Sequence, residues 1–121
     1  MPIEANLSDL LPTALERFDS FGLLWRRERK QFEAGWSVQE SLRPYLLDSK
    51  LTDEWPGTHV FYGSELYCTY HLCAESLVVL KRATDILELF GPGGPEDLAF
   101  FQQGIVKFTS ISHEREAWFA T

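Results

Sequence analysis

The stretch AESLVVLKRATDILELF, residues 74–90, is the clearest helical signal in the chain and decides its predicted fold. Its apolar residues recur at steps of three and four, which places them on one face of a helix. They are Leu77, Leu80, Ala83, Leu87 and Phe90. Gly91 and Pro92 follow at once, and this pair typically ends a helix. Strand-like segments lie on both sides, so we predict one helix packed across one antiparallel sheet.

The N-terminal third of the chain shows helical patterns. Within residues 7–32 large apolar side chains repeat every seven positions, and Gly22 is a point where this segment divides or bends. Ser37–Glu40 has the Ser-x-x-Glu spacing of a capping box, in which both side chains bond backbone amides at a helix start. We therefore predict a short helix over residues 38–47, followed by a polar loop over residues 48–58.

A β-hairpin is predicted on the N-terminal side of the central helix. Residues 59–62 and 65–72 read as its strands, around Gly63-Ser64. In the second strand apolar and polar residues alternate, and one face carries Leu66, Cys68, Tyr70 and Leu72. Such alternation means that one face of the strand is buried, so we expect the central helix to cover it.

Three short strands are predicted to follow the helix as a meander. They comprise residues 98–102, 105–112 and 116–120, joined by turns at 103–104 and 113–115. Pro95–Asp97, just before them, has proline first and acids next, which is the order of a first helical turn. The predicted fold is thus a single α+β domain over residues 1–121. It has N-terminal helices, then an antiparallel sheet of about five strands with the central helix on one face.

The chain is acidic and rich in aromatic residues. Its 121 residues carry a formal net charge of −7, and 14% of them are aromatic. Because phosphates attract basic surfaces, this charge argues against a nucleic-acid partner and favours a basic protein. We expect no membrane span, since no apolar run approaches the roughly 18 residues required. No secretory signal is recognisable, so Cys68 and Cys73 are expected to be free thiols in a cytoplasmic protein.

The residue types that carry catalysis form no recognised motif in this sequence. His59, His71 and His113 are the best grouping for a zinc ion, with Glu114 or Cys68 as a further ligand. Their spacing fits no zinc motif. We therefore predict no metal and no other cofactor. The alternative is a small enzyme or ligand-binding domain. Its site would lie on the sheet face opposite the helix, near Tyr67, His71 and His113.

Acids and tryptophans near predicted turns are typical of a binding surface. The carboxylates of residues 96–97, of Glu114 and of Glu116 are expected to line a solvated acidic edge, although paired acids also serve glycosidic chemistry. Trp36, Trp55 and Trp118 lie in or near predicted ends and turns. Half-buried rings at such places act either as contact points for another protein or as anchors that hold loops to the core.

Three segments of the second half of the chain support a resemblance. They are Trp55-Pro56-Gly57-Thr58, Pro95-Glu96-Asp97-Leu98 with Phe100-Phe101, and Ser110-Ile111-Ser112-His113-Glu114. Together they resemble small stand-alone bacterial proteins of uncharacterised type, some of which are similar to immunity proteins of polymorphic toxin systems. The resemblance spans residues 55–119 and implies a cytoplasmic protein that binds and blocks a toxin domain.

Charge, aromatic content and this resemblance together predict a non-catalytic protein-binding domain. The expected partner is another protein, such as a basic toxin domain that is neutralised through an acidic, aromatic-rich surface. The residues expected to bind it are Trp55, Glu96, Asp97, His113, Glu114 and Trp118. A homo-oligomer that buries an aromatic patch is a third hypothesis.

Overall fold

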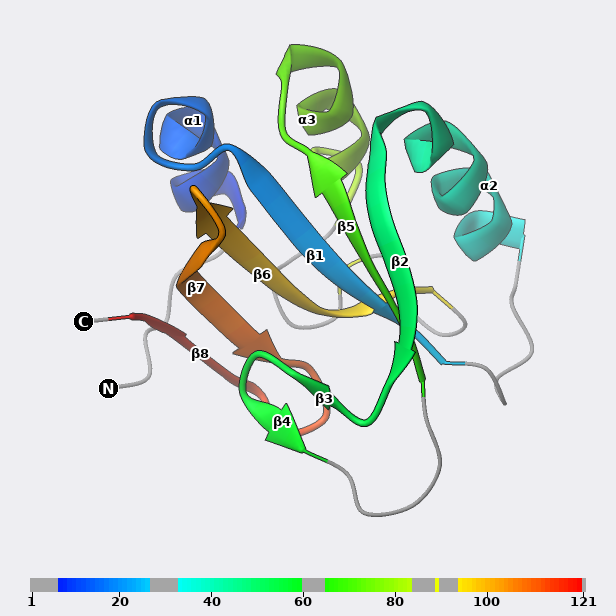
Figure 1. Ribbon diagram of the computed structural model, residues 1–121. Helices are drawn as coiled ribbons and strands as arrows, with labels where there is room; N and C mark the ends of the chain where they lie inside the picture. Colours follow the sequence, from blue (N-terminus) through cyan, green and yellow to red (C-terminus); the bar gives the residue numbers. More distant parts are fainter. Residues whose placement is uncertain (1–6, 27–32, 60–64, 84–88, 90–93, 121) are drawn as a thin grey trace.

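The computed structural model describes residues 7–26, 33–59, 65–83, 89 and 94–120, and for residues 7–9 and 33–36 it describes the backbone alone. Six strands of these segments form one antiparallel sheet in the order β2-β5-β1-β6-β7-β8 (Figure 1). Their bounds are β1 Ser20–Trp25, β2 Leu46–Thr52, β5 Glu65–His71, β6 Glu96–Gln102, β7 Ile105–Ile111 and β8 Glu116–Phe119. Strand β1 lies inside the sheet between β5 and β6, and β2 and β8 form the two edges.

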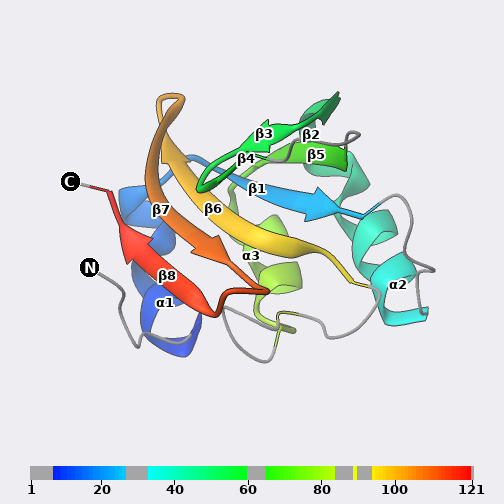
Figure 2. The same ribbon diagram turned by 90° about the horizontal axis from the view of Figure 1, so that it is seen from below.

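Helices cover one face of this sheet, and a small hairpin lies on the other (Figures 1 and 2). The helices are α1 Leu7–Arg17, α2 Glu33–Leu42 and α3 Ala74–Leu80, with a short 3-10 helix η1, Arg43–Tyr45, between α2 and β2. The hairpin consists of β3 Glu54–Trp55 and β4 Thr58–His59. Over the described ranges, no helix is both long enough and apolar enough to cross a membrane.

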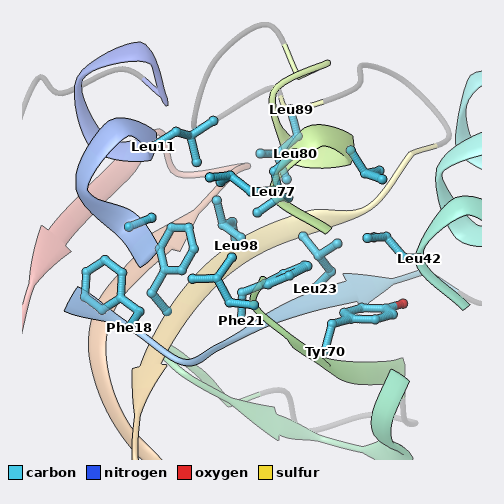
Figure 3. Packing of buried hydrophobic residues seen from close by; sticks show 14 of the residues in the cluster. Leu11, Phe18, Phe21, Leu23, Leu42, Tyr70, Leu77, Leu80, Leu89 and Leu98 are labelled. Carbon is cyan, nitrogen blue, oxygen red and sulfur yellow. The ribbon is translucent and has the colours of Figure 1, made fainter. Parts of the chain in front are cut away.

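The main core fills the layer between the sheet and the three helices (Figure 3). Phe21 of the central strand is fully buried there, in one cluster with Leu11 of α1, Leu42 of α2 and Leu77 of α3. Each such side chain contributes roughly 1.5–3 kcal/mol when it leaves water. This layer therefore holds the helices on the sheet and fixes the face that remains for other contacts.

The helix predicted over residues 7–32 is wrong in its second half. Helix α1 ends at Arg17, and residues 20–25 form strand β1. Leu24 faces the hairpin, whereas its neighbours on either side belong to the core under the helices. A strand that is buried on both faces reads as a continuous apolar run, without the alternation that identifies a strand. Residues 27–32 lie outside the described part of the chain.

The two elements predicted next also differ from the structure. Helix α2 begins at Glu33 rather than at residue 38, and it ends at Leu42. Residues 48–58, predicted as a loop, contain most of β2 and all of β3. Strand β2 was not predicted because all its residues except Thr52 are exposed, so its sequence shows no apolar periodicity.

The hairpin predicted around Gly63-Ser64 is wrong in its pairing. His59 pairs with Glu54 inside the β3–β4 hairpin, while β5 pairs with β1 and β2. Residues 60–64 lie outside the described part of the chain. The alternation along β5 is confirmed, since Cys68 and its same-face neighbours belong to the core beneath the helices. Within the described ranges the sheet thus has six strands rather than about five, and the helices are interspersed with them rather than all N-terminal.

The central helix and the meander are confirmed in outline. Helix α3 begins at Ala74 and packs Leu77 against the sheet, but it ends at Leu80, short of its predicted end. Much of the predicted remainder lies outside the described residues. Strands β6, β7 and β8 form the predicted meander. The helical turn predicted at Pro95–Asp97 is wrong, because the two acids begin strand β6.

Candidate functional site

The β3–β4 hairpin rests on the sheet face opposite the helices through its turn. Gly57 has a φ of +85°, a conformation that favours glycine. A Cβ atom at this position would lie 2.9 Å from Cγ2 of Thr109 and 3.2 Å from Cδ1 of Ile111. The backbone of the turn therefore sits directly on side chains of β7, which leaves no room for a larger residue.

Trp55 holds the hairpin down from its first strand. The residue is 4% exposed and packs with Leu24, Tyr67 and Phe101 on the sheet. Its indole Nε1 donates a 2.9 Å hydrogen bond to Oδ2 of Asp97, at the start of β6. This bond supplies a buried carboxyl oxygen with a polar partner that replaces water.

Asp97 is built into the structure through both of its carboxyl oxygens. It is 1% exposed, and its Oδ1 accepts a 2.7 Å hydrogen bond from the backbone N–H of Ser112. In return, the backbone N–H of Asp97 donates to Oγ of Ser112 at 3.1 Å. Asp97 also has a φ of 56°, in the left-handed region that aspartate tolerates better than most residues. The residue therefore joins the hairpin, the start of β6 and the end of β7.

Glu96 extends this cluster toward the end of β1. Its Oε2 accepts a 2.9 Å hydrogen bond from Nε of Arg26 in a partly buried ion pair. The guanidinium of Arg26 lies over the Trp55 ring, 5.9 Å from its centroid. Because the cation contacts both the ring and the carboxylate, it links Glu96 to Trp55.

Tyr67 lies beneath the hairpin with its hydroxyl group sealed from solvent. Among the described residues, its Oη has no hydrogen-bond partner. The ring reaches across Gly22 so closely that a Cβ there would lie 1.9 Å from Oη. Burial, and then the nearby charge of Asp97, raises the pKa of Tyr67 well above its usual value. The group is therefore a neutral phenol, and glycine is required at position 22 to accommodate it.

The remaining predicted site residues lie on the β7–β8 hairpin. His113 and Glu114 are exposed in its turn, with His113 Nε2 3.9 Å from Glu114 Oε1. Trp118 is half-buried on β8 and pairs with Thr109, the residue under Gly57. Ser112, which precedes this turn, is the residue that binds Asp97. The six predicted residues thus form two groups: Trp55, Glu96 and Asp97 in a buried cluster, and the other three on the neighbouring turn and edge strand.

The residues of the alternative site are not brought together. His71 is the last residue of β5 and pairs with Ser20, the first residue of β1. His113 lies in the turn after Ile111, the last residue of β7. Tyr67 pairs with Leu24 and packs under Trp55 of the hairpin. The side chain of His59, the third histidine, lies beside that of Asp53, with His59 Nε2 3.7 Å from Asp53 Oδ2. Within the described ranges, no three His, Cys, Asp or Glu residues are grouped closely enough to hold a metal ion.

The described surface contains hollows near the hairpin and near the start of β2. One of about 540 Å³ is lined by residues 54–59 of the hairpin. The other, of about 210 Å³, lies between the start of β2, β5 and α2. Its lining residues are Gln39, Arg43, Leu46, Ser49, Leu66, Cys68 and Tyr70. Burial raises the pKa of the Cys68 thiol, and a hydrogen bond with Tyr70 offsets part of this rise. A neutral thiol is a weak nucleophile, so Cys68 is not activated in this hollow.

Sequence reasoning missed two residues of the buried cluster. These are Arg26, which binds Glu96, and Ser112, which binds Asp97. Arg26 lies 70 positions before Glu96 in the chain, and Ser112 lies 15 positions after Asp97. No local pattern marks such pairs. No family model, curated protein or solved structure matches this chain.

Proposed function

We propose that this protein is a non-catalytic, cytoplasmic protein-binding domain that neutralises a basic toxin domain through an acidic surface. This surface is formed by the β3–β4 hairpin and the adjoining β7–β8 turn. One observation carries the proposal. The acids of this region divide into buried ones that hold the hairpin in place, Glu96 and Asp97, and exposed ones that face outward. The exposed acids are Asp53, Glu54, Glu114 and Glu116.

The buried acids support binding by making the surface rigid. Trp55 and Ser112 occupy both carboxyl oxygens of Asp97, so the hairpin and the turn are tied to the same residue. A loop that is ordered before binding loses less conformational entropy when a partner arrives. The same bonds engage the carboxyl groups that an enzyme would need for acid–base chemistry, which favours recognition over catalysis.

The exposed acids support a basic partner. They add to a net charge of −7, and a field of one sign speeds the approach of an oppositely charged protein. Half-buried Trp118 stands on the neighbouring edge strand and offers an aromatic contact of the kind found at the centre of interfaces. An immunity protein that must bind a basic nuclease-like toxin quickly has these two requirements.

The test uses charge reversal on this face. Tagged wild-type protein and the variant E54K/E114K serve as baits in extracts of the native host, and captured proteins are identified by mass spectrometry. The matched control is E16K/E75K, which reverses two exposed acids on helices α1 and α3 with the same change in net charge. We expect the wild type and the control to capture a basic protein that E54K/E114K captures at least about tenfold less well. Equal capture by all three baits, or none by the wild type, contradicts the proposal.

The proposed neutralisation of a toxin is tested separately, by bacterial growth. The captured partner, expressed alone in a susceptible bacterium, is expected to arrest growth. Co-expression with the wild type or with E16K/E75K is expected to restore growth, whereas E54K/E114K is not. A partner that is harmless when expressed alone leaves a protein-binding domain but removes the role as an immunity protein.

A further inference from the structure

Strand β2 is an exposed edge with unusual side chains for a free edge. Among the described residues, the seven residues of this strand, Leu46–Thr52, pair with β5 alone. Leu46, Leu47 and Leu51 are 43%, 61% and 58% exposed. Unpaired backbone groups beside exposed leucines are a template for another strand, which natural proteins usually avoid or use. We propose that β2 pairs antiparallel with β2 of a second copy of this chain, which joins the two sheets across a two-fold axis at Ser49.

The sequence of β2 is complementary to itself about this axis. With Ser49 opposite Ser49, Asp48 of each copy faces Lys50 of the other. Both charged residues lie on the hairpin face of the sheet, because their partners on β5 are Thr69 and Tyr67. Opposite charges on directly facing residues stabilise an antiparallel pair, and the symmetry forms this contact twice.

The charges also select one register. Paired residues of two strands must share a face, so the register shifts in steps of two residues. A shift of one step in either direction places Asp48 opposite Asp48 or Lys50 opposite Lys50. Like charges in these positions are destabilising. Only the pairing about Ser49 places both opposite charges face to face.

The leucines complete the contact. In the same register, Leu51 of each copy comes opposite Leu47 of the other. Leu51 lies on the helix face, since its partner on β5 is Leu66, which packs against the core. The hollow of about 210 Å³ beside Leu46 and Ser49 opens at this edge and offers space to an apolar side chain from the second copy. The irregular pairing with β5 falls at Leu47, outside the central Asp48–Lys50 contacts.

Affinity is expected to be moderate. Two seven-residue strands bury less than the roughly 1,200–2,000 Å² of a standard interface, so the dimer should dissociate at concentrations on the order of micromolar. Both edge strands of the dimer are then the β8 strands, and the face with the β3–β4 hairpin stays open. The proposal does not depend on the function proposed above.

Exchanging the charges at positions 48 and 50 tests the proposed dimer. The dimer dissociation constant is measured by sedimentation equilibrium. D48K and K50D each place like charges opposite each other and are expected to weaken the dimer about tenfold or more. The double variant D48K/K50D restores both pairs and is expected to return to the wild-type constant. Asp48 and Lys50 are exposed, so none of these variants disturbs the core. K107D, which reverses an exposed lysine on β7, is the control and should dimerise as the wild type does.

The two single variants separate specific pairing from general charge repulsion. D48K lowers the net negative charge of the chain and K50D raises it, so general repulsion would move their dissociation constants in opposite directions. Specific pairing moves both in the same direction. A wild-type protein that stays monomeric at high micromolar concentration overturns the proposal. Opposite shifts in the single variants, or failure of the double variant to recover, also overturn it.

Discussion

The indole Nε1 of Trp55 donates a 2.9 Å hydrogen bond to Oδ2 of Asp97, a residue 42 positions further along the chain. This bond closes the β3–β4 hairpin over the sheet, because the other oxygen of Asp97 is held by Ser112 at the end of β7. The hairpin itself has only two short strands, too little to be stable alone. Its position on the sheet therefore depends on the Trp55–Asp97 contact and on the packing around it.

Removing the indole donor should loosen this anchor. W55F keeps an aromatic ring against Leu24 but leaves Oδ2 of Asp97 buried with one donor fewer. An unsatisfied buried polar atom costs roughly 1–3 kcal/mol, so we expect the free energy of unfolding in urea to fall by about that amount. W118F, at a half-buried ring on β8, is the control and should lose clearly less. Equal losses would show that ring size, rather than the hydrogen bond, matters at Trp55.

The two buried tyrosines of β5 should differ in how the loss of the hydroxyl group changes the free energy of unfolding. Tyr70 Oη accepts a 3.0 Å hydrogen bond from Nε1 of Trp25, so Y70F leaves a buried indole N–H unpaired and should cost roughly 1–3 kcal/mol. Tyr67 Oη has no partner in the described structure, so Y67F should leave stability unchanged or raise it by about 1 kcal/mol. Urea denaturation of both variants gives the comparison. A large loss in Y67F would mean that its hydroxyl group is satisfied in solution.

The parts of the fold that the sequence predicted are those with periodic apolar residues or clear turn signals. Helix α3 buries Leu77 and Leu80 and exposes Val78, and β5 alternates apolar with polar residues. The meander was bounded by its turn signals at residues 103–104 and 113–115. Strand β1 is buried on both faces, and β2 is exposed along nearly its whole length. Neither has the alternation on which a prediction depends, so the centre and one edge of the sheet were missed.

The candidate site was predicted to a similar degree. Trp55, Glu96 and Asp97 were singled out as acids and an aromatic ring near turns, and the structure places them in one cluster. Their burial was not foreseen, because it results from a hairpin folding over the sheet. Arg26 and Ser112 complete the cluster from distant segments, and only the tertiary structure reveals contacts of that kind.

The turn of the β3–β4 hairpin allows its packing to be separated from its backbone conformation. Gly57 and Gly104 both have positive φ, at +85° and +78°, so alanine is strained at either position by about 1–2 kcal/mol. A Cβ at Gly104 meets nothing within 4 Å, whereas at Gly57 it lies 2.9 Å from Thr109 Cγ2. We therefore expect G57A to lower the free energy of unfolding more than G104A does. Equal losses would mean that the turn does not rest on β7.

Stability should fall at alkaline pH because of the buried thiol and phenols. Burial raises the pKa of Cys68 above 9.0 and that of Tyr70 above 10.0 in the folded protein. Above these ordinary values, the unfolded chain has lost protons that the folded protein still holds. The free energy of unfolding therefore declines as pH rises through this range, by at most about 1.4 kcal/mol per pH unit for each group.

The contribution of the Cys68 thiol can be isolated by comparing how steeply the free energy of unfolding falls with pH in the wild type and in C68A. C68A removes the thiol that titrates. The free energy of unfolding of C68A, measured in urea, should therefore begin to decline nearer pH 10.0, where the tyrosines start to titrate in the unfolded chain. C73A, which removes the other thiol at the start of α3, is the matched control. The slope with pH is the measured quantity, since alanine at the buried position 68 also lowers stability at every pH by leaving a small cavity. Parallel profiles for the wild type and C68A would show that Cys68 does not contribute to the pH dependence.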